Sequence, residues 1–136
     1  MATIGVGTNT TVKTLDDKNL PVGAVPIGTF VMGWNENSRT KDTTQVIAWT
    51  SRTASKMYQI RLSGYTVDLA SEHKVLTSNG WVPVNKIIPE QSIKGISGAW
   101  ITVKEITVRD EEVQVCNLEC TPYNSFYANG LCVQGA

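Results

Sequence analysis

Short segments rich in β-branched and aromatic residues, separated by turn residues, recur along the whole chain and limit its fold more than any other feature. Few windows repeat apolar residues at the three- and four-residue spacing of a helix, so the sequence predicts no helix. The predicted strands are residues 12–15, 30–34, 46–50, 57–62, 65–69, 75–77, 80–84, 100–108 and 113–120. Strands this frequent, joined by short connections, predict an all-β fold.

Two stretches do not follow a strand pattern. Residues 36–44 are polar and are predicted to form an exposed loop. Residues 87–98 contain a proline and two glycines and are predicted to form a connection without a strand. The Asn79-Gly80 and Asn129-Gly130 pairs favour tight turns between neighbouring strands.

Length and charge narrow the class of protein. The chain has 136 residues, which predicts a single domain over residues 1–136. Its 12 basic and 12 acidic residues balance and form no basic block, which argues against nucleic-acid binding. No apolar run approaches the ~18 residues that a membrane span needs, and the first residues lack a signal-peptide pattern. We therefore expect a cytoplasmic monomer that contacts neither nucleic acid nor membrane.

The cysteines Cys116, Cys120 and Cys132 are odd in number, so at least one thiol has no partner within the chain. Cys116 and Cys120 fall on one predicted strand, about 13 Å apart at ~3.3 Å per residue, which exceeds the reach of a disulfide. Together with His73 these residues could form a zinc site, but their spacing lacks the C-x₂-C pair of such sites. We therefore predict reduced, buried thiols, no metal and no cofactor.

Four tryptophans, Trp34, Trp49, Trp81 and Trp100, fall on separate predicted strands. Indole rings bury a large apolar area and keep one polar N–H group. We expect them to pack in the core and at its rim. A stacking surface for a ligand is the alternative.

The C-terminal run from Cys116 to Val133 resembles the closing segment of the intein and hedgehog-type self-processing domains, the Hint family. The residues in register with the family pattern are Phe126, Ala128, Asn129, Gly130 and Val133. Further patches resemble the family in the same order at residues 10–17, 27–34 and 65–84. The resemblance covers nearly the whole chain. It implies a compact, horseshoe-shaped Hint fold with both termini near its centre.

The resemblance also implies where self-processing chemistry would lie. In this family a first-position Cys or Ser attacks the preceding carbonyl, and a histidine of the middle motif protonates the leaving nitrogen. A terminal Asn, helped by a penultimate His, then cyclises and releases the other side. The corresponding positions are Gly5, Ala70, His73, Asn117, Gln134 and Gly135. Only His73 keeps the family's usual residue; the others replace a nucleophile, Thr, Asp, His and Asn.

Three other assignments stay open. Ala2 fits the first position only with a three-residue insertion, so Gly5 is preferred. Some family members start instead from a Cys of the closing motif, and Cys116 lies one residue from that place. A shift of one residue turns a side chain to the other face of a strand, and that class carries a Trp where this chain has Val75. Gln134 as the cyclising amide would form a larger, slower ring.

Two functions fit these observations. The first is a Hint self-processing domain that acts at most once per molecule on its flanking polypeptide in cis, inactive or impaired through natural or introduced substitutions. The second is a non-catalytic structural or binding module on the same scaffold. For the first, we expect His73 to lie close to Gly5 and Gln134. We also expect Cys at position 5, with His and Asn at positions 134 and 135, to restore thiol-dependent cleavage.

Overall fold

The computed structural model describes residues 4–136; residues 1–3, and with them Ala2, lie outside the described residues. The described part contains strands and two short 3-10 turns, and no α-helix. The strands are β1 (Val6–Gly7), β2 (Thr11–Lys13), β3 (Asn19–Pro21), β4 (Phe30–Asn35), β5 (Thr40–Leu62), β6 (Tyr65–Ala70), β7 (Lys74–Thr77), β8 (Gly80–Pro83), β9 (Ser92–Lys94), β10 (Trp100–Thr121), β11 (Ser125–Ala128) and β12 (Leu131–Gln134). The turns are η1 (Val22–Ala24) and η2 (Val84–Lys86).

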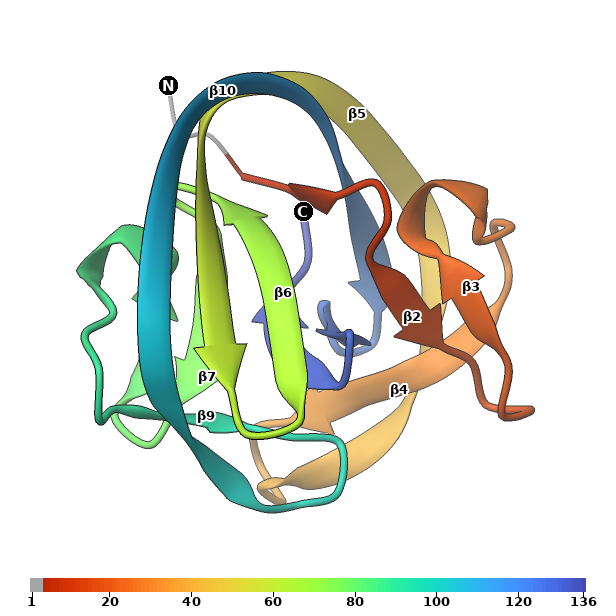
Figure 1. The fold of residues 1–136 in the computed structure, drawn as a ribbon. Helices are drawn as coiled ribbons and strands as arrows, with labels where there is room; N and C mark the ends of the chain where they lie inside the picture. The colour runs from red at the N-terminus through yellow and green to blue at the C-terminus, as the bar shows by residue number, and fades with distance from the viewer. Residues whose placement is uncertain (1–3) are drawn as a thin grey trace.

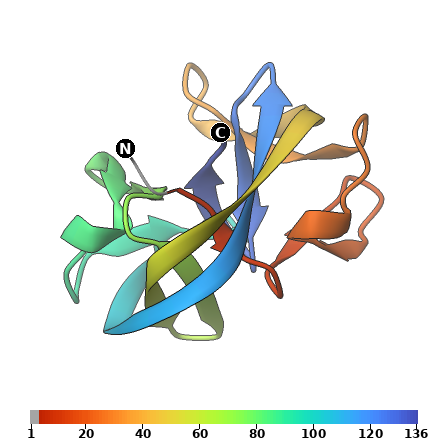
Figure 2. The same ribbon diagram turned by 90° about the horizontal axis from the view of Figure 1, so that it is seen from above.

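The strands pair into one antiparallel sheet that curls on itself. Its order is β3-β2-β11-β12-β7-β9-β10-β1-β6-β5-β4, with β8 on β7 and a second pairing between β10 and β5. In Figures 1 and 2, β5 and β10 run side by side and bend over together as an arch, and the C-terminal segment lies inside it. The predicted all-β, horseshoe-shaped fold is confirmed.

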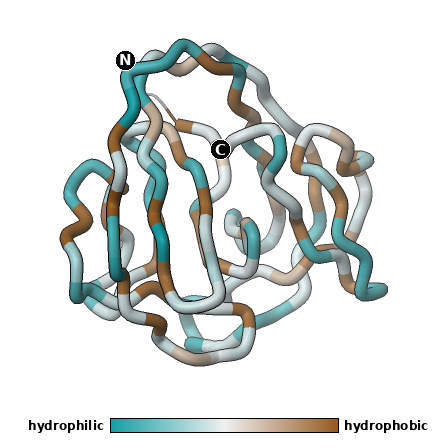
Figure 3. The backbone as a smooth tube through the Cα atoms, viewed as in Figure 1, coloured by the Kyte–Doolittle hydropathy of each residue, from teal (hydrophilic) through white to brown (hydrophobic). Residues whose placement is uncertain are grey.

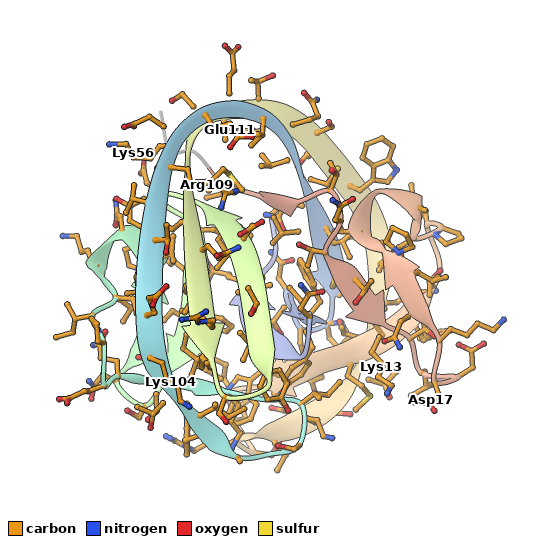
Figure 4. The ribbon with its side chains drawn as sticks, viewed as in Figure 1. Lys13, Asp17, Lys56, Lys104, Arg109 and Glu111 are labelled. Atoms are coloured by element: carbon orange, nitrogen blue, oxygen red, sulfur yellow. The ribbon has the colours of Figure 1, made fainter. Side chains whose placement is uncertain are left out.

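The arch corrects the predicted strand boundaries. Residues 46–50 and 57–62 belong to one strand, β5, and residues 100–108 and 113–120 to another, β10. The pairing of β10 with β5 shifts register between Asp110 and Val113, where a β-bulge increases the local bend. Figure 4 labels Lys56, Arg109 and Glu111 near this crest. The charged residues there mark a bend within one strand, and the sequence pattern alone suggested a gap between two.

Two predicted connections also contain strands. In the predicted loop at residues 36–44, the turn ends at Arg39, and β5 already begins at Thr40 and pairs with β4. The predicted connection at residues 87–98 holds β9, whose Ile93 is fully buried and pairs with Thr77 and Ile101. In both cases, pairing with a neighbouring strand outweighs the local sequence pattern, because strand preference depends on context.

The main core lies between the curled halves of the sheet. Val6, Leu69, Leu118 and Phe126 come from β1, β6, β10 and β11 and are fully buried in it. Figure 3 shows hydrophobic residues alternating with hydrophilic ones along the strands of the arch, as expected where one face packs inward. No helix in the described residues is long and apolar enough to cross a membrane.

The Asn129-Gly130 pair forms the predicted tight turn, between β11 and β12. Both residues have positive φ, 49° and 86°, which is the requirement of a type I′ hairpin turn. The Asn129 Oδ1 atom accepts a hydrogen bond from the Thr11 amide at 2.8 Å, and its Nδ2 donates to the Thr66 carbonyl at 2.9 Å. The turn therefore fastens β2 and β6 to the closing hairpin.

We predict that Gly130→Ala destabilises the fold more than Gly98→Ala. Both glycines have positive φ, 86° and 94°, so each substitution costs about 1–2 kcal/mol of backbone strain. A Cβ at Gly130 would also lie 2.6 Å from Tyr65 Cε1, whereas a Cβ at Gly98 meets nothing within 4 Å. Urea unfolding should place the Gly130→Ala midpoint below that of Gly98→Ala; equal midpoints would contradict the packing at Tyr65.

Candidate active site

His73 lies directly before β7, where the chain turns out of β6. Its amide donates to the Ala70 carbonyl at 3.0 Å, and its own carbonyl accepts from the Val84 amide at 2.9 Å. These bonds fix the backbone, and the imidazole is 1% exposed. A histidine held this deeply is part of the interior, unlike the surface residue that its polar neighbours in the sequence would suggest.

The imidazole joins the two ends of the described chain. Its Nδ1 atom accepts a hydrogen bond from the Gly5 amide at 2.8 Å, and its Nε2 atom lies 2.8 Å from the Gln134 carbonyl oxygen. Because Nδ1 is an acceptor, the ring proton must reside on Nε2, which donates to Gln134. The predicted closeness of His73 to Gly5 and Gln134 is confirmed, and the ring is neutral in this arrangement.

Strand register explains the convergence. Val133 on β12 pairs with Val75 on β7, and the two strands are antiparallel. Continued past this pair, the register sets Gln134 opposite Lys74 and Gly135 near His73. On the other side, Val6 pairs with both Leu69 on β6 and Cys116 on β10. Continued by one residue, this register places Gly5 between Ala70 and Asn117. The Ala70 amide donates to the Gly5 carbonyl at 2.9 Å.

Asn117 is buried beside Gly5, and only one of the two polar groups of its side-chain amide forms a hydrogen bond. Its Oδ1 atom accepts from the Leu118 amide at 2.9 Å, while its Nδ2 atom has no hydrogen-bond partner among the described residues. An unpaired buried donor costs about 1–3 kcal/mol. As an uncharged amide, it neither donates a labile proton nor accepts one at neutral pH.

The space that a first-position side chain would need is filled. Gly5 has φ +150°, and a Cβ built on it would lie 2.5 Å from Val115 Cγ2 and 2.8 Å from Val115 Cβ. Contacts that short require something to move. Val115 is fully buried with Met57 and Ala70 around it, so it is the side chain that occupies this volume.

The closing segment is filled in the same way by Asn124. Its carbonyl accepts from the Gly135 amide at 2.8 Å, and its Nδ2 donates to the Ala136 carbonyl at 2.5 Å. A Cβ at Gly135 would collide with the Asn124 Oδ1 atom and come within 2.7 Å of the Leu118 carbonyl oxygen. An asparagine at position 135 therefore does not fit unless both Asn124 and the backbone at Leu118 move.

Sequence reasoning missed both Val115 and Asn124. Val115 carried one available signal, because it lies two residues before Asn117 and so shares its face of the strand. Asn124 carried no signal, since it reaches the site through the fold of the turn before β11.

The structure turns Cys116 away from Gly5. A Cβ at Gly23 would lie 3.4 Å from the Cys116 Sγ atom, which places the thiol towards η1, in the main core. Val115 and Asn117 point to the opposite face, as alternation along a strand requires. The hypothesis that Cys116 replaces the missing first-position nucleophile is therefore not supported by its placement.

The three cysteines are buried and form no disulfide, as predicted. Burial raises the pKa of Cys120 to about 12, and burial is also the main reason that the pKa of Cys132 rises well above its ordinary value. Within residues 4–136, no three His, Cys, Asp or Glu side chains come close enough together to hold a metal ion.

Burial lowers the pKa of His73 from 6.5 to about 4, against a smaller opposing effect of the Gln134 carbonyl. The unfolded chain takes up a proton near pH 6.5 and the folded chain only near pH 4. The native state therefore loses stability as the pH falls through this window, by about 3 kcal/mol for this group.

We predict that His73→Gln flattens this pH dependence. Unfolding by urea between pH 7 and pH 4 should show the free energy of unfolding of the parent chain falling by about 3 kcal/mol more than that of the variant. Carboxylate titration is common to both proteins and cancels in the comparison. Parallel curves would contradict a neutral, buried His73.

Comparison with family models finds no match for the sequence, and comparison with curated proteins finds none either. Solved structures do match over nearly the whole chain. The bacterial intein-like domain from Clostridium thermocellum has a TM-score of 0.88 at 16% identity, covering 99% of this chain and 100% of that one. The DnaB intein from Synechocystis has a TM-score of 0.90 at 16% identity, covering 98% and 99%.

The DnaX mini intein from Spirulina platensis has a TM-score of 0.84 at 19% identity, covering 96% of this chain and 99% of that one. At these identities the similarity establishes the fold. The chain has the fold of bacterial intein-like domains and mini-inteins, as the motif resemblance implied.

Proposed function

We propose that this chain is an intein-like self-processing domain, acting in cis on a flanking polypeptide and arrested with its present residues. The observation that supports this most is the position of His73, whose ring binds the amide of Gly5 and the carbonyl of Gln134. The fold thus brings the entering and leaving segments to one imidazole. On this proposal the junctions are the Ile4–Gly5 and Gly135–Ala136 peptide bonds.

At the first junction, His73 is placed to act on the leaving nitrogen. Its Nδ1 atom is 2.8 Å from the Gly5 nitrogen, within reach for proton transfer. A side-chain nucleophile at position 5 would give its proton to Nδ1 as it attacks the Ile4 carbonyl carbon, and Nδ1 would pass that proton to the Gly5 nitrogen as the C–N bond breaks. Glycine supplies no such nucleophile, so the peptide bond stays intact.

Self-processing is blocked by the packing of side chains as well as by the missing nucleophile. Val115 occupies the volume of a first-position side chain, and Asn124 occupies that of a residue at position 135. The expectation that Cys at position 5, with His and Asn at positions 134 and 135, restores thiol-dependent cleavage is therefore revised, because Val115 must also be trimmed before position 5 can take a side chain.

A second function, a non-catalytic binding module, draws support from Asn124. This residue binds the Gly135 amide, the Ala136 carbonyl and the Cys120 amide. Asn124 thus holds the last two residues of the chain by hydrogen bonds, which suits a scaffold that binds a polypeptide without cleaving it.

We predict that the chain with a carrier protein fused on each side stays intact. Mass spectrometry after long incubation, with and without added thiol, should show only the full-length fusion, because no nucleophile lies at position 5. Cleavage at either junction would show that the arrest proposed here is absent.

We predict that Gly5→Cys gains thiol-dependent cleavage only together with Val115→Ala. The cysteine sulfur would attack the carbonyl of Ile4, forming a thioester as the C–N bond breaks, and added thiol would then release the upstream carrier. Val115→Ala removes the closest contact, at 2.5 Å. The 2.8 Å contact with the Cβ of residue 115 stays, and position 5 has φ +150°, so the backbone there must also shift to take the cysteine.

Val113→Ala is the matched control, because Val113 lies on the same strand and packs against the same cluster as Val115. Gly5→Cys with Val113→Ala should remain uncleaved, and His73→Ala should abolish the cleavage gained with Val115→Ala. If a folded Gly5→Cys/Val115→Ala protein stays intact in thiol, the binding-module function is favoured.

A further inference from the structure

Three of the four tryptophans gather on one side of the molecule, which their separate strands did not reveal. Trp34 on β4 and Trp81 on β8 line two neighbouring cavities, and Trp100 on β10 lines one of these. The cavity nearer the closing segment has a volume of about 330 Å³. We call it the Trp81 cavity; it is lined by Trp34, Glu36, Trp81, Tyr123, Asn124 and Gln134, among others.

The aromatic walls of the Trp81 cavity are fixed in place. The Trp81 indole N–H donates to the Glu36 carboxylate. The Tyr123 hydroxyl donates to the Asp42 carboxylate at 3.2 Å and accepts from Asn35 Nδ2 at 2.8 Å. Rings held by hydrogen bonds at their polar edges present their faces at little cost in side-chain entropy.

The charge of the Trp81 cavity is negative. Glu36 is the only charged residue among the described residues that line it, and its carboxylate forms no ion pair. Two basic groups lie outside the Trp81 cavity: Arg39 lines the neighbouring cavity, which Glu36 also lines, and the Lys94 ammonium lies over the rings of Trp34 and Trp100. An unpaired carboxylate beside aromatic faces is the chemistry that selects a cation.

The Trp81 cavity also lies next to the C-terminal residues Gly135 and Ala136. Gln134 and Asn124 form part of its wall, and Asn124 binds both Gly135 and Ala136. A polypeptide that continues after Ala136 in a host would start at this wall. Each extended residue adds about 3.3–3.6 Å, so its first few side chains reach the aromatic rings.

We propose that the Trp81 cavity binds an arginine or lysine side chain of the polypeptide that follows Ala136. This assignment of the occupant rests on the proposed function, since it requires a host segment at that end. The cation stacks on Trp81 and Tyr123 and pairs with the free oxygen of Glu36. Such binding holds the downstream segment next to the closing strand.

The test extends the chain after Ala136 by Gly-Ser-Arg-Ser-Gly or by Gly-Ser-Gln-Ser-Gly. The indole N–H resonance of Trp81 in nitrogen–proton correlation spectra is the readout. We expect it to differ between the two extensions, and the difference to shrink with added salt, because salt screens exposed charges. The Trp49 indole on β5, which does not line the Trp81 cavity, should stay unchanged.

Glu36→Gln keeps an acceptor for the Trp81 indole and removes the charge. In this variant the Arg-minus-Gln shift difference should fall about five-fold, the size expected for a partly exposed ion pair. Glu112→Gln, at the exposed crest of the arch, removes the same charge elsewhere and should leave the difference intact. Identical spectra for both extensions, or an equal loss in Glu112→Gln, would overturn the assignment. Neither readout needs cleavage, so the binding site and the self-processing function can fail separately.

Discussion

One neutral imidazole holds together the two places where the chain enters and leaves the sheet. His73 accepts from Gly5, just before the first strand, and donates to Gln134 on the last. The first bond is buried and the second partly buried, so an unmade hydrogen bond there is expensive. Protonation of Nδ1 breaks the bond from the Gly5 amide, while Nε2 still donates to the Gln134 carbonyl. The closed form of the horseshoe therefore depends on the ring staying neutral, and burial lowers the pKa of His73 to about 4, which keeps it so.

Much of the fold was predictable because two signals agreed. Alternating, turn-bounded segments predicted an all-β chain, and the order of the motif patches predicted the horseshoe. What the pattern could not predict was the length of β5 and β10. Their charged crest near Asp110 looks like a loop in sequence, but the ladder between the two strands continues through a bulge. Ile93 was missed for a related reason, since a single buried residue leaves no period.

The sequence predicted which residues meet at His73, but not which side chains fill the space around them. Motif spacing predicted that His73 lies close to Gly5 and Gln134, and strand register brings these residues together. The side chains that fill the vacated space, Val115 and Asn124, belong to no motif. They are found only once the strands are assembled, and they fill the volume beside Gly5 and Gly135.

The burial of all three thiols has a practical side. Cys116, Cys120 and Cys132 are sheltered from solvent, and the pKa of Cys120, at about 12, keeps that sulfur in its unreactive protonated form at neutral pH. An alkylating reagent meets them only when the sheet opens. The rate at which these thiols are alkylated in the native chain therefore reports how readily the fold opens, and no added probe is needed.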